Sequence, residues 1–352
     1  MAHHFDVTLV ADLLGQDGKT VFEDFGIDQL EAFDIPYHYL AEDLRPVTPD
    51  QIKNTDVIIS MGQPYVPSSF TDTNRLTLIA RTGVGYDMVD LDAATEADVM
   101  VTITPEATKK PVASATLALI LGLCHRVRIK DAIVRNNTWS SRFNHMGCEI
   151  RDRVVGLIGV GQIGQEVVRL LKSFEPAEIL AADPMLTSEE AARIGVRLVE
   201  KDALLQDSDF ISIHCPLNRY THKLIGEREF KLMKPSAFII NTARGPIIDQ
   251  MALTTALKER WIQGAAIDVF EEEPIDPSDP LLSLENIILS PHASAWTYEL
   301  FRDIGHDCMK ATLAVARGEI PPYVVNRSVL DRPGLIDKLS RYKDIWTDRT
   351  PA

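Results

Sequence analysis

The sequence is poor in cysteine, has no excess of basic residues and contains no long apolar run, and each absence excludes a class of protein. Its four cysteines, Cys124, Cys148, Cys215 and Cys308, are far apart in the chain and show no metal-ligand spacing, so we expect free thiols and no metal. The formal net charge of −15 argues against nucleic acid and anionic membranes as partners. No apolar run reaches the length of a transmembrane helix, and Met1–Asp6 lacks the features of a signal peptide, so we expect a cytoplasmic location.

The length and the pattern of the chain predict two domains of α/β type. A chain of 352 residues is longer than one hydrophobic core usually requires. In the first third, short apolar runs alternate with helical patterns: strands are predicted over 7–10, 57–60, 76–80 and 100–103, and helices over 26–32 and 48–53. Long helices are predicted over 111–134 and 297–317, and residues 327–352 show no motif.

The stretch Gly159-Val160-Gly161-Gln162-Ile163-Gly164 has the spacing of a dinucleotide-binding turn. An apolar run precedes it, and apolar residues with helical spacing follow it. The first glycine permits a tight turn, the second lets a pyrophosphate approach the backbone, and the third lets the helix pack on its strand. We therefore expect Gly159, Gly161, Gln162, Ile163 and Gly164 to bind the cofactor.

A second predicted strand, over 178–182, ends in Asp183, and this residue indicates which cofactor is bound. A carboxylate at that position can accept hydrogen bonds from both ribose hydroxyls, although Asp183 could also be a simple cap before Pro184. It repels a 2′-phosphate, and residues 184–186 offer no Arg or Lys to receive one. The sequence therefore favours NAD over NADP.

Strands and helices alternate through the rest of this half, which predicts a doubly wound parallel sheet. The strands are expected over 154–158, 178–182, 197–199, 210–214, 237–240, 265–268 and 286–289. Ligands of such sheets bind beyond the carboxyl ends of the strands, so the polar residues there are the candidates for chemistry.

Three of these residues suit hydride transfer at a 2-hydroxy acid. Arg244 can hold a carboxylate and a carbonyl oxygen, His292 can exchange a proton near neutral pH, and Glu273 can stabilise the imidazolium. Each also has a plainer interpretation: a surface ion pair for Arg244, a structural or exposed histidine, and a solvated acidic face over 271–273. The residues alone do not choose among the three glutamates.

Several motifs, in order and spacing, resemble the D-isomer-specific 2-hydroxyacid dehydrogenase family. They are Gly156 to Gly164, His214 to Asn218 with Thr221, Met233 to Gly245, Gly264 to Pro274, and Ser290-Pro291-His292. The likeness spans roughly residues 55 to 326 and includes the phosphoglycerate dehydrogenase-like and glyoxylate–hydroxypyruvate reductase-like members.

The resemblance implies a Rossmann doubly wound NAD domain inserted in a smaller, flavodoxin-like α/β substrate domain. The NAD domain would comprise residues 109–299, and the discontinuous substrate domain 1–108 and 300–352. Arg244 would bind the substrate, and Glu273, the acid directly before Pro274, would form a proton relay with His292. The cofactor would also contact Pro216, Thr221, Ala243 and, at the carboxamide, Asp268, and the backbone of Val84 and Gly85 would hold the substrate carboxylate. Members are typically homodimers through the NAD domain.

The predicted reaction is NAD-dependent hydride transfer between the nicotinamide and C2 of a small D-2-hydroxy or 2-oxo acid, an EC 1.1.1.- activity. Residues 60–64 lack a phosphate-binding cation, which argues against phosphoglycerate, and Met88 and Ser114-Ala115 also depart from the family pattern. For Arg81, beside the glycine turn, the alternatives are a contact with the substrate and a structural ion pair, and we expect the ion pair. The alternatives are an NAD-sensing, corepressor-like binding protein and a phosphite- or formate-type dehydrogenase, although formate enzymes carry glutamine where Glu273 stands.

Overall fold

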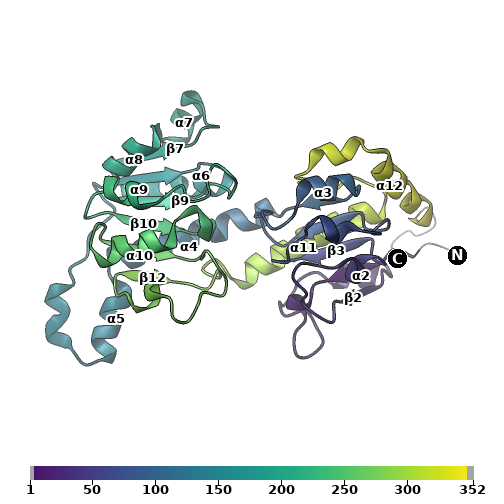
Figure 1. Cartoon of the computed structure of the whole chain (residues 1–352), viewed down its shortest axis with the longest axis horizontal. Coiled ribbons are helices and arrows are strands. Elements are labelled where there is room, and N and C mark those ends of the chain that lie inside the picture. The colour runs from purple at the N-terminus through teal and green to yellow at the C-terminus, as the bar shows by residue number, and fades with distance from the viewer. Residues whose placement is uncertain (1–3, 347–352) are drawn as a thin grey trace. The chain divides into compact units, whose positions relative to one another are not determined.

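The computed structural model describes residues 4–346, and the chain divides into two compact units (Figure 1). The first unit contains the chain up to Thr108 and again from Trp296 onward, and the second contains Lys109–Ala295. The chain thus leaves the first unit, builds the second without interruption and returns at residue 296, shortly before the predicted boundary at 300.

The first unit is built on a five-stranded parallel sheet in the order β2-β1-β3-β4-β5. Its strands are β1 (Val7–Leu9), β2 (Tyr37–Tyr39), β3 (Val57–Ser60), β4 (Leu78–Arg81) and β5 (Met100–Thr102). Four of them match predicted strands to within two residues. The edge strand β2 was not predicted, because its half-buried tyrosines and exposed histidine form no apolar run.

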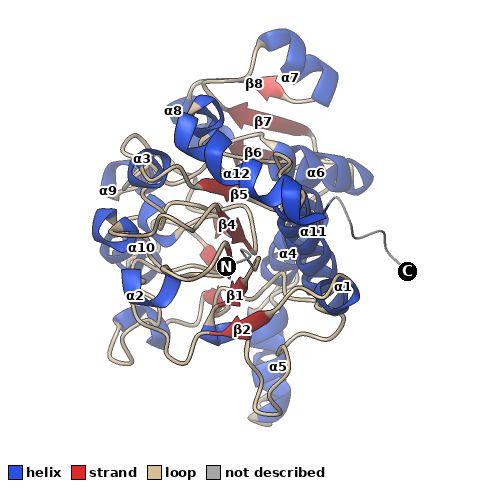
Figure 2. Cartoon of the chain, turned by 90° about the vertical axis from the view of Figure 1, so that its right-hand side faces the viewer, coloured by secondary structure: helices blue, strands red, loops and turns tan. Residues whose placement is uncertain are grey.

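Helices cover both faces of this sheet, as Figure 2 shows. On one face lie α1 (Asp28–Ala32) and α11 (Tyr298–Ala316), and on the other α2 (Pro49–Ile52) and α3 (Leu91–Glu96). The segment for which the sequence indicated no role forms α12 (Pro333–Trp346), which packs against α11. Lys338 fastens α12 by donating hydrogen bonds from Nζ to the carbonyl oxygens of Leu76, Ala97 and Asp98.

The second unit is built on a seven-stranded parallel sheet in the order β12-β11-β10-β9-β6-β7-β8, which confirms the predicted doubly wound fold. Its strands are β6 (Val154–Ile158), β7 (Glu178–Ala182), β8 (Arg197–Leu198), β9 (Phe210–Ile213), β10 (Phe238–Asn241), β11 (Gly264–Ile267) and β12 (Ile287–Leu289). They agree with the predicted strands to within about a residue at each end.

Two layers of buried side chains pack helices onto the two faces of this sheet. Successive strand residues point to opposite faces, so Ile211 and Ile213 join one layer while Phe210 joins the other. The first layer holds α8 (Lys201–Asp207), α9 (Glu227–Leu232) and α10 (Gln250–Lys258), and the second holds α4 (Pro105–Cys124), α6 (Gln162–Leu171) and α7 (Ser188–Ile194).

The single helix predicted over 111–134 was wrong. Helix α4 begins at Pro105, where a proline suits the first turn, and it continues past Pro111 to Cys124. Arg126 then adopts a left-handed conformation, with φ of +51°, and α5 (Val127–Arg135) starts in a new direction. The strict alternation was also wrong at one place, because only a short 3₁₀ turn, Pro280–Ser283, precedes β12.

Helix α4 also corrects the expectation that no segment reaches membrane-spanning length. Among residues 4–346 it is the one helix whose length and composition would allow it to cross a membrane. Its Ala113, Ile120 and Leu123 are buried against the sheet of the second unit. This packing is that of a core helix.

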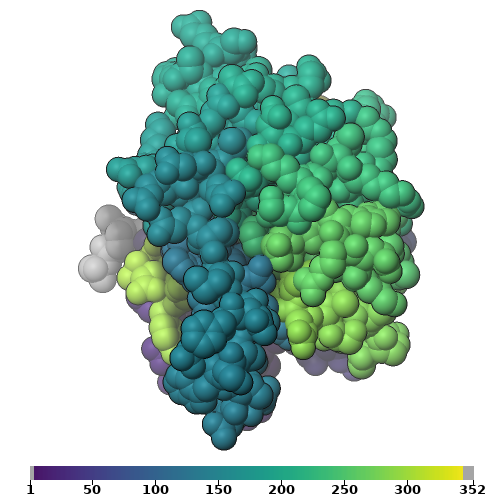
Figure 3. Space-filling view, turned by 90° about the vertical axis from the view of Figure 1, so that its left-hand side faces the viewer, coloured from purple at the N-terminus to yellow at the C-terminus, as the bar shows by residue number. Residues whose placement is uncertain are grey.

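Residues 125–147, which we call the arm, project from the second unit between α4 and β6. The arm contains α5 and a 3₁₀ helix, Trp139–Asn144, and Figures 1 and 3 show it standing away from the sheet. At its base, Arg126 Nε donates a hydrogen bond to the carbonyl oxygen of Met146, at 2.8 Å.

Candidate active site

The glycine turn between β6 and α6 has the shape that a pyrophosphate requires. Gly159 has φ of +89°, and a Cβ there would lie 2.7 Å from the backbone nitrogen of Cys215. A Cβ at Gly164 would lie 2.6 Å from the carbonyl oxygen of Gly159. At Gly161, the N-cap of α6, a Cβ would meet no atom within 4 Å. The turn therefore has no room for a side chain at Gly159 and Gly164, where the backbone packs closely. It leaves free space at Gly161, in front of the N-H groups of α6.

Asp183 lies beside this turn, at the end of β7. Its Oδ2 accepts a hydrogen bond from the N-H of Val160 at 2.8 Å, and its Oδ1 accepts one from the N-H of Met185 at 2.9 Å. The second bond is the cap that the sequence offered as an alternative, while the first ties the carboxylate to the glycine turn. The same side chain thus makes both contacts.

Loops that follow β9 and β10 carry the other residues predicted at the cofactor. Thr221 Oγ1 donates to the carbonyl oxygen of Pro216 at 2.6 Å and accepts from the N-H of Asn218, which closes the loop after β9. After β10, the N-H of Ala243 donates to Asn241 Oδ1 at 3.0 Å. Both loops start at the carboxyl edge of the sheet, as the glycine turn does.

His292 and Glu273 are in direct contact. Glu273 follows β11, His292 follows β12, and the distance from His292 Nδ1 to Glu273 Oε2 is 2.7 Å. The other carboxylate oxygen, Oε1, accepts the N-H of Phe270 at 3.0 Å. The fixed position of Glu273 leaves Nε2 as the nitrogen on the far side of the imidazole ring.

The loop that carries His292 is held by Asp268. His292 has φ of +56°, a left-handed conformation that non-glycine residues seldom adopt, and its N-H donates to the carbonyl oxygen of Asp268 at 2.7 Å. The Asp268 carboxylate accepts the N-H groups of Ala293 and Ser294, both at 3.0 Å, and the Ser294 hydroxyl at 2.6 Å. Sequence reasoning missed Ser294, whose only signal was its place two residues after the histidine.

Arg244 lies at the end of β10, in the turn that starts with Asn241. Its Nη1 donates to the carbonyl oxygen of Ala243 at 2.7 Å, and its own carbonyl oxygen accepts from Asn241 Nδ2 at 2.9 Å. The second unit thus brings Arg244, Glu273, His292 and Asp268 to the same edge of one sheet.

Val84 and Gly85 belong to the first unit, in the loop after β4. Gly83, with φ of +150°, accepts the N-H of Thr104 on its carbonyl oxygen at 3.0 Å. Arg81, which is 4% exposed, donates from Nε and Nη2 to the carbonyl oxygen of Gly85. Its guanidinium group therefore holds the loop that carries the two predicted substrate residues.

The family follows from comparison with known proteins. Residues 117–294 match the family model described as "D-isomer specific 2-hydroxyacid dehydrogenase, NAD binding domain". A glyoxylate reductase from Korarchaeum cryptofilum is 38% identical over 285 residues, which cover 80% of this chain and 86% of that protein. The chain belongs to the D-isomer-specific 2-hydroxyacid dehydrogenase family.

Two further relatives of the dehydrogenase agree. A D-3-phosphoglycerate dehydrogenase from Methanocaldococcus jannaschii is 36% identical over 90% of this chain and 59% of its own length. The crystal structure of D-lactate dehydrogenase from Aquifex aeolicus, complexed with NAD and lactic acid, has a TM-score of 0.80 and 27% identity, covering 91% of this chain and 99% of that one. The dehydrogenase is an NAD-dependent enzyme that transfers hydride at C2 of a 2-hydroxy or 2-oxo acid.

The electrostatics of the dehydrogenase favour an ionised Glu273. Burial acts to raise the pKa of its carboxyl group, but the hydrogen bond and charge of His292, the N-H of Phe270 and the charge of Arg244 together lower it. In the part of the chain that the structure describes, no three His, Cys, Asp or Glu side chains could together hold a metal ion.

Proposed function

We propose that the dehydrogenase reduces small, unphosphorylated 2-oxo acids, glyoxylate among them, to the corresponding D-2-hydroxy acids. The contact between His292 Nδ1 and Glu273 Oε2 carries the proposal, because it couples a proton donor to a carboxylate at the strand ends where ligands of this fold bind. The glyoxylate reductases among its relatives support the choice of substrate.

In this proposal each catalytic side chain has one task. The guanidinium group of Arg244 binds the substrate carboxylate and polarises its carbonyl group. His292 donates a proton from Nε2 to the carbonyl oxygen, while Glu273 stabilises the positive charge of the ring through Nδ1. NADH, when bound, supplies the hydride that C2 accepts, and the open glycine turn with Asp183 would hold it.

The loop after β3 supports an unphosphorylated substrate. Gln63 is buried there, and its amide Nε2 donates to the carboxylates of Asp12 and Asp43 at 2.8 and 3.0 Å. Arg45 also donates to both carboxylates. The positive charge of Arg45 is thus balanced by two carboxylates, which weakens its attraction for a phosphate group.

Initial rates with NADH test this proposal. Glyoxylate, hydroxypyruvate and pyruvate should be turned over, and phosphohydroxypyruvate should be a poor substrate. His292→Asn and Glu273→Gln should lower kcat by about 100-fold or more without weakening NADH binding. His306→Asn, an exposed histidine of α11, serves as the matched control. Turnover of His292→Asn at the wild-type rate would refute the assigned roles.

We propose further that the enzyme is a homodimer formed through the arm. The arm exposes five large apolar side chains to between 54% and 74% of their surface: Val127, Val134, Trp139, Phe143 and Met146. Such a concentration of apolar surface is typical of an interface, and the arm that projects in Figure 3 can pack against a second copy of the chain.

Sedimentation tests this proposal. A Trp139→Glu/Phe143→Glu variant should sediment as a monomer. Met185 lies outside the arm and is 87% exposed, so Met185→Glu should leave the sedimenting mass at that of the dimer. A monomeric wild-type enzyme would contradict the proposal.

A further inference from the structure

Two cysteines that are far apart in the sequence meet at the base of the arm. Cys124 is the last residue of α4, and Cys148 stands just past the arm, before β6. The N-H of Cys148 donates to the carbonyl oxygen of Cys124 at 2.9 Å. With standard bond lengths, this hydrogen bond keeps the two Cα atoms within about 7 Å at most. Disulfides have Cα separations of roughly 4.4–6.8 Å, so the backbone needs little or no movement to allow one.

The segment before Cys148 is pressed against the end of α4. A Cβ at Gly147 would lie 2.3 Å from the carbonyl oxygen of Cys124, so glycine is needed for the chain to pass there. Each of the two thiol groups also shifts the pKa of the other. The backbone therefore brings the two cysteine residues together.

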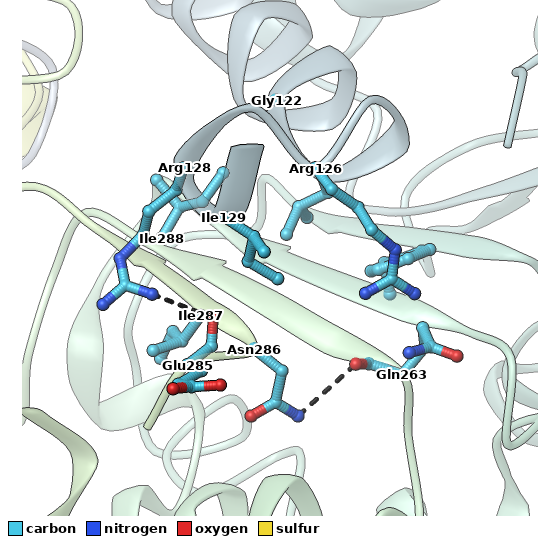
Figure 4. A pocket seen from close by; sticks show the side chains of 11 residues that line it. Gly122, Arg126, Arg128, Ile129, Gln263, Glu285, Asn286, Ile287 and Ile288 are labelled. Atoms are coloured by element: carbon cyan, nitrogen blue, oxygen red, sulfur yellow. Dashed lines mark hydrogen bonds between the residues drawn. The ribbon is translucent and has the colours of Figure 1, made fainter. Parts of the chain in front are cut away.

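Cys124 and Cys148 both line a cavity of about 190 Å³, which gives a small oxidant a route toward them. Arg126 and Arg153 also line this cavity. Figure 4 shows Arg126 in the adjoining pocket, with its side chain pointing toward Gln263, which directly precedes β11. Two guanidinium groups close to a thiol stabilise its thiolate form.

The two thiols differ in acidity. Interaction with the Cys124 thiol and the charges of Arg153 and Arg126 lower the pKa of Cys148 to about 7, against the effects of burial and Asp209. Interaction with the Cys148 thiol and burial both raise the pKa of Cys124. Cys148 is therefore the nucleophile of the pair, and Cys124 stays protonated until it reacts.

We propose that Cys124 and Cys148 form a peroxide-reactive dithiol that closes to a disulfide across the base of the arm. The Cys148 thiolate attacks one oxygen of a hydroperoxide, so an S–O bond forms, the O–O bond breaks, and the leaving hydroxide takes up a proton. Cys124 sulfur then attacks the sulfenic sulfur, which forms the S–S bond and releases the hydroxyl group with the Cys124 proton as water. Two thiols are oxidised, and one hydrogen peroxide is reduced to two waters. The disulfide closes the arm into a covalent loop.

The test is treatment of the reduced, full-length enzyme with hydrogen peroxide. The mass should fall by two hydrogen atoms, digestion without reductant should yield the Cys124–Cys148 peptide pair, and dithiothreitol should reverse both changes. Cys124→Ser should stop at a sulfenic acid on Cys148 that dimedone traps. Cys148→Ser should lose thiols at least tenfold more slowly, while Cys215→Ser should still form the pair.

Absence of the linked peptides in the oxidised wild type would overturn the proposal, and so would an unchanged rate of thiol loss in Cys148→Ser. Cys148→Ala provides a second removal of the thiol if the serine variant does not fold. A protease that cuts within the arm should separate the reduced chain into two fragments. In the oxidised chain the same two fragments should stay linked, a result that depends on the disulfide alone.

Discussion

Arg81 and Gly85 are joined by two hydrogen bonds, from Nε at 3.2 Å and from Nη2 at 2.9 Å to the same carbonyl oxygen. Both bonds come from a charged group, and such bonds contribute about 1.5–3 kcal/mol each when buried. They fix a loop that has glycines at 83 and 85 and little stiffness of its own.

Arg81→Met should therefore raise KM for the oxo acid by about tenfold, with a smaller change in kcat, since the loop rather than the proton relay is loosened. NADH binding should not change, because the glycine turn belongs to the other unit. Steady-state kinetics and fluorescence titration with NADH measure the two effects. The control is Arg317→Met, which removes an exposed ion pair with Glu319. An unchanged KM would mean that the loop holds its shape without Arg81.

Asp183→Asn should weaken NADH binding by about tenfold. It should also reduce the ratio of the affinity for NADH to the affinity for NADPH. The amide carries no charge to repel a 2′-phosphate, and it is a poorer acceptor for the N-H of Val160. Dissociation constants for both cofactors check this expectation. Asp152→Asn, outside the turn, is the matched control. Equal loss of affinity for NADH and NADPH would indicate that the residue supports the turn only.

His214 should make the stability of the enzyme fall in mild acid. Burial lowers its pKa from 6.5 to about 4, so between these values the unfolded chain binds a proton that the folded chain does not. Stability from this group is complete above pH 6.5 and is lost as the pH falls toward 4, by about 2–3 kcal/mol. Urea unfolding should show that the free energy of unfolding falls less between pH 7 and pH 5 for His214→Gln than for the wild type. An equal fall in the two proteins would refute this role of His214.

Lys338→Met should destabilise the first unit by about 3 kcal/mol. Methionine fills a similar volume, but the carbonyl oxygens of Leu76, Ala97 and Asp98 lose their buried donor. Thermal unfolding measures the effect, and Lys343→Met, an exposed residue of the same helix, should have little. A wild-type melting temperature in Lys338→Met would show that α12 is held by its apolar residues alone.

Much of the sheet architecture could be predicted because parallel strands are buried on both faces and appear as apolar runs. Ile239 and Ile240 are both 0% exposed, and so are Ile58 and Ile59. Local break points could not be predicted in the same way. Arg126 adopts a left-handed conformation, and the chain changes direction there between α4 and α5; an arginine does not indicate such a conformation. Helix α12 did leave a signal, since Leu335, Leu339 and Tyr342 recur with helical spacing and are all buried.

For the candidate site, residue types indicated the chemistry but not the contacts that hold the catalytic residues in place. The motif around His292 predicted a proton donor, and the structure adds that Asp268 and Ser294 hold its loop. Those contacts depend on tertiary geometry that spacing does not encode. Likewise, the meeting of Cys124 and Cys148 depends on the fold of the arm between them.

The interrupted path of the chain has a consequence for synthesis on the ribosome. All five strands of the first sheet emerge early, yet α11, which covers one of its faces, is encoded after the whole second unit. At about 5–20 residues per second, the ribosome needs roughly 10–40 s to make the intervening segment. During that time the nascent first sheet has an apolar face that α11 does not yet cover, whereas the second unit has its complete sequence as soon as residue 295 is made. The first domain to begin is thus the last to finish, and nascent chains stalled near residue 295 should bind chaperones through β1 to β5.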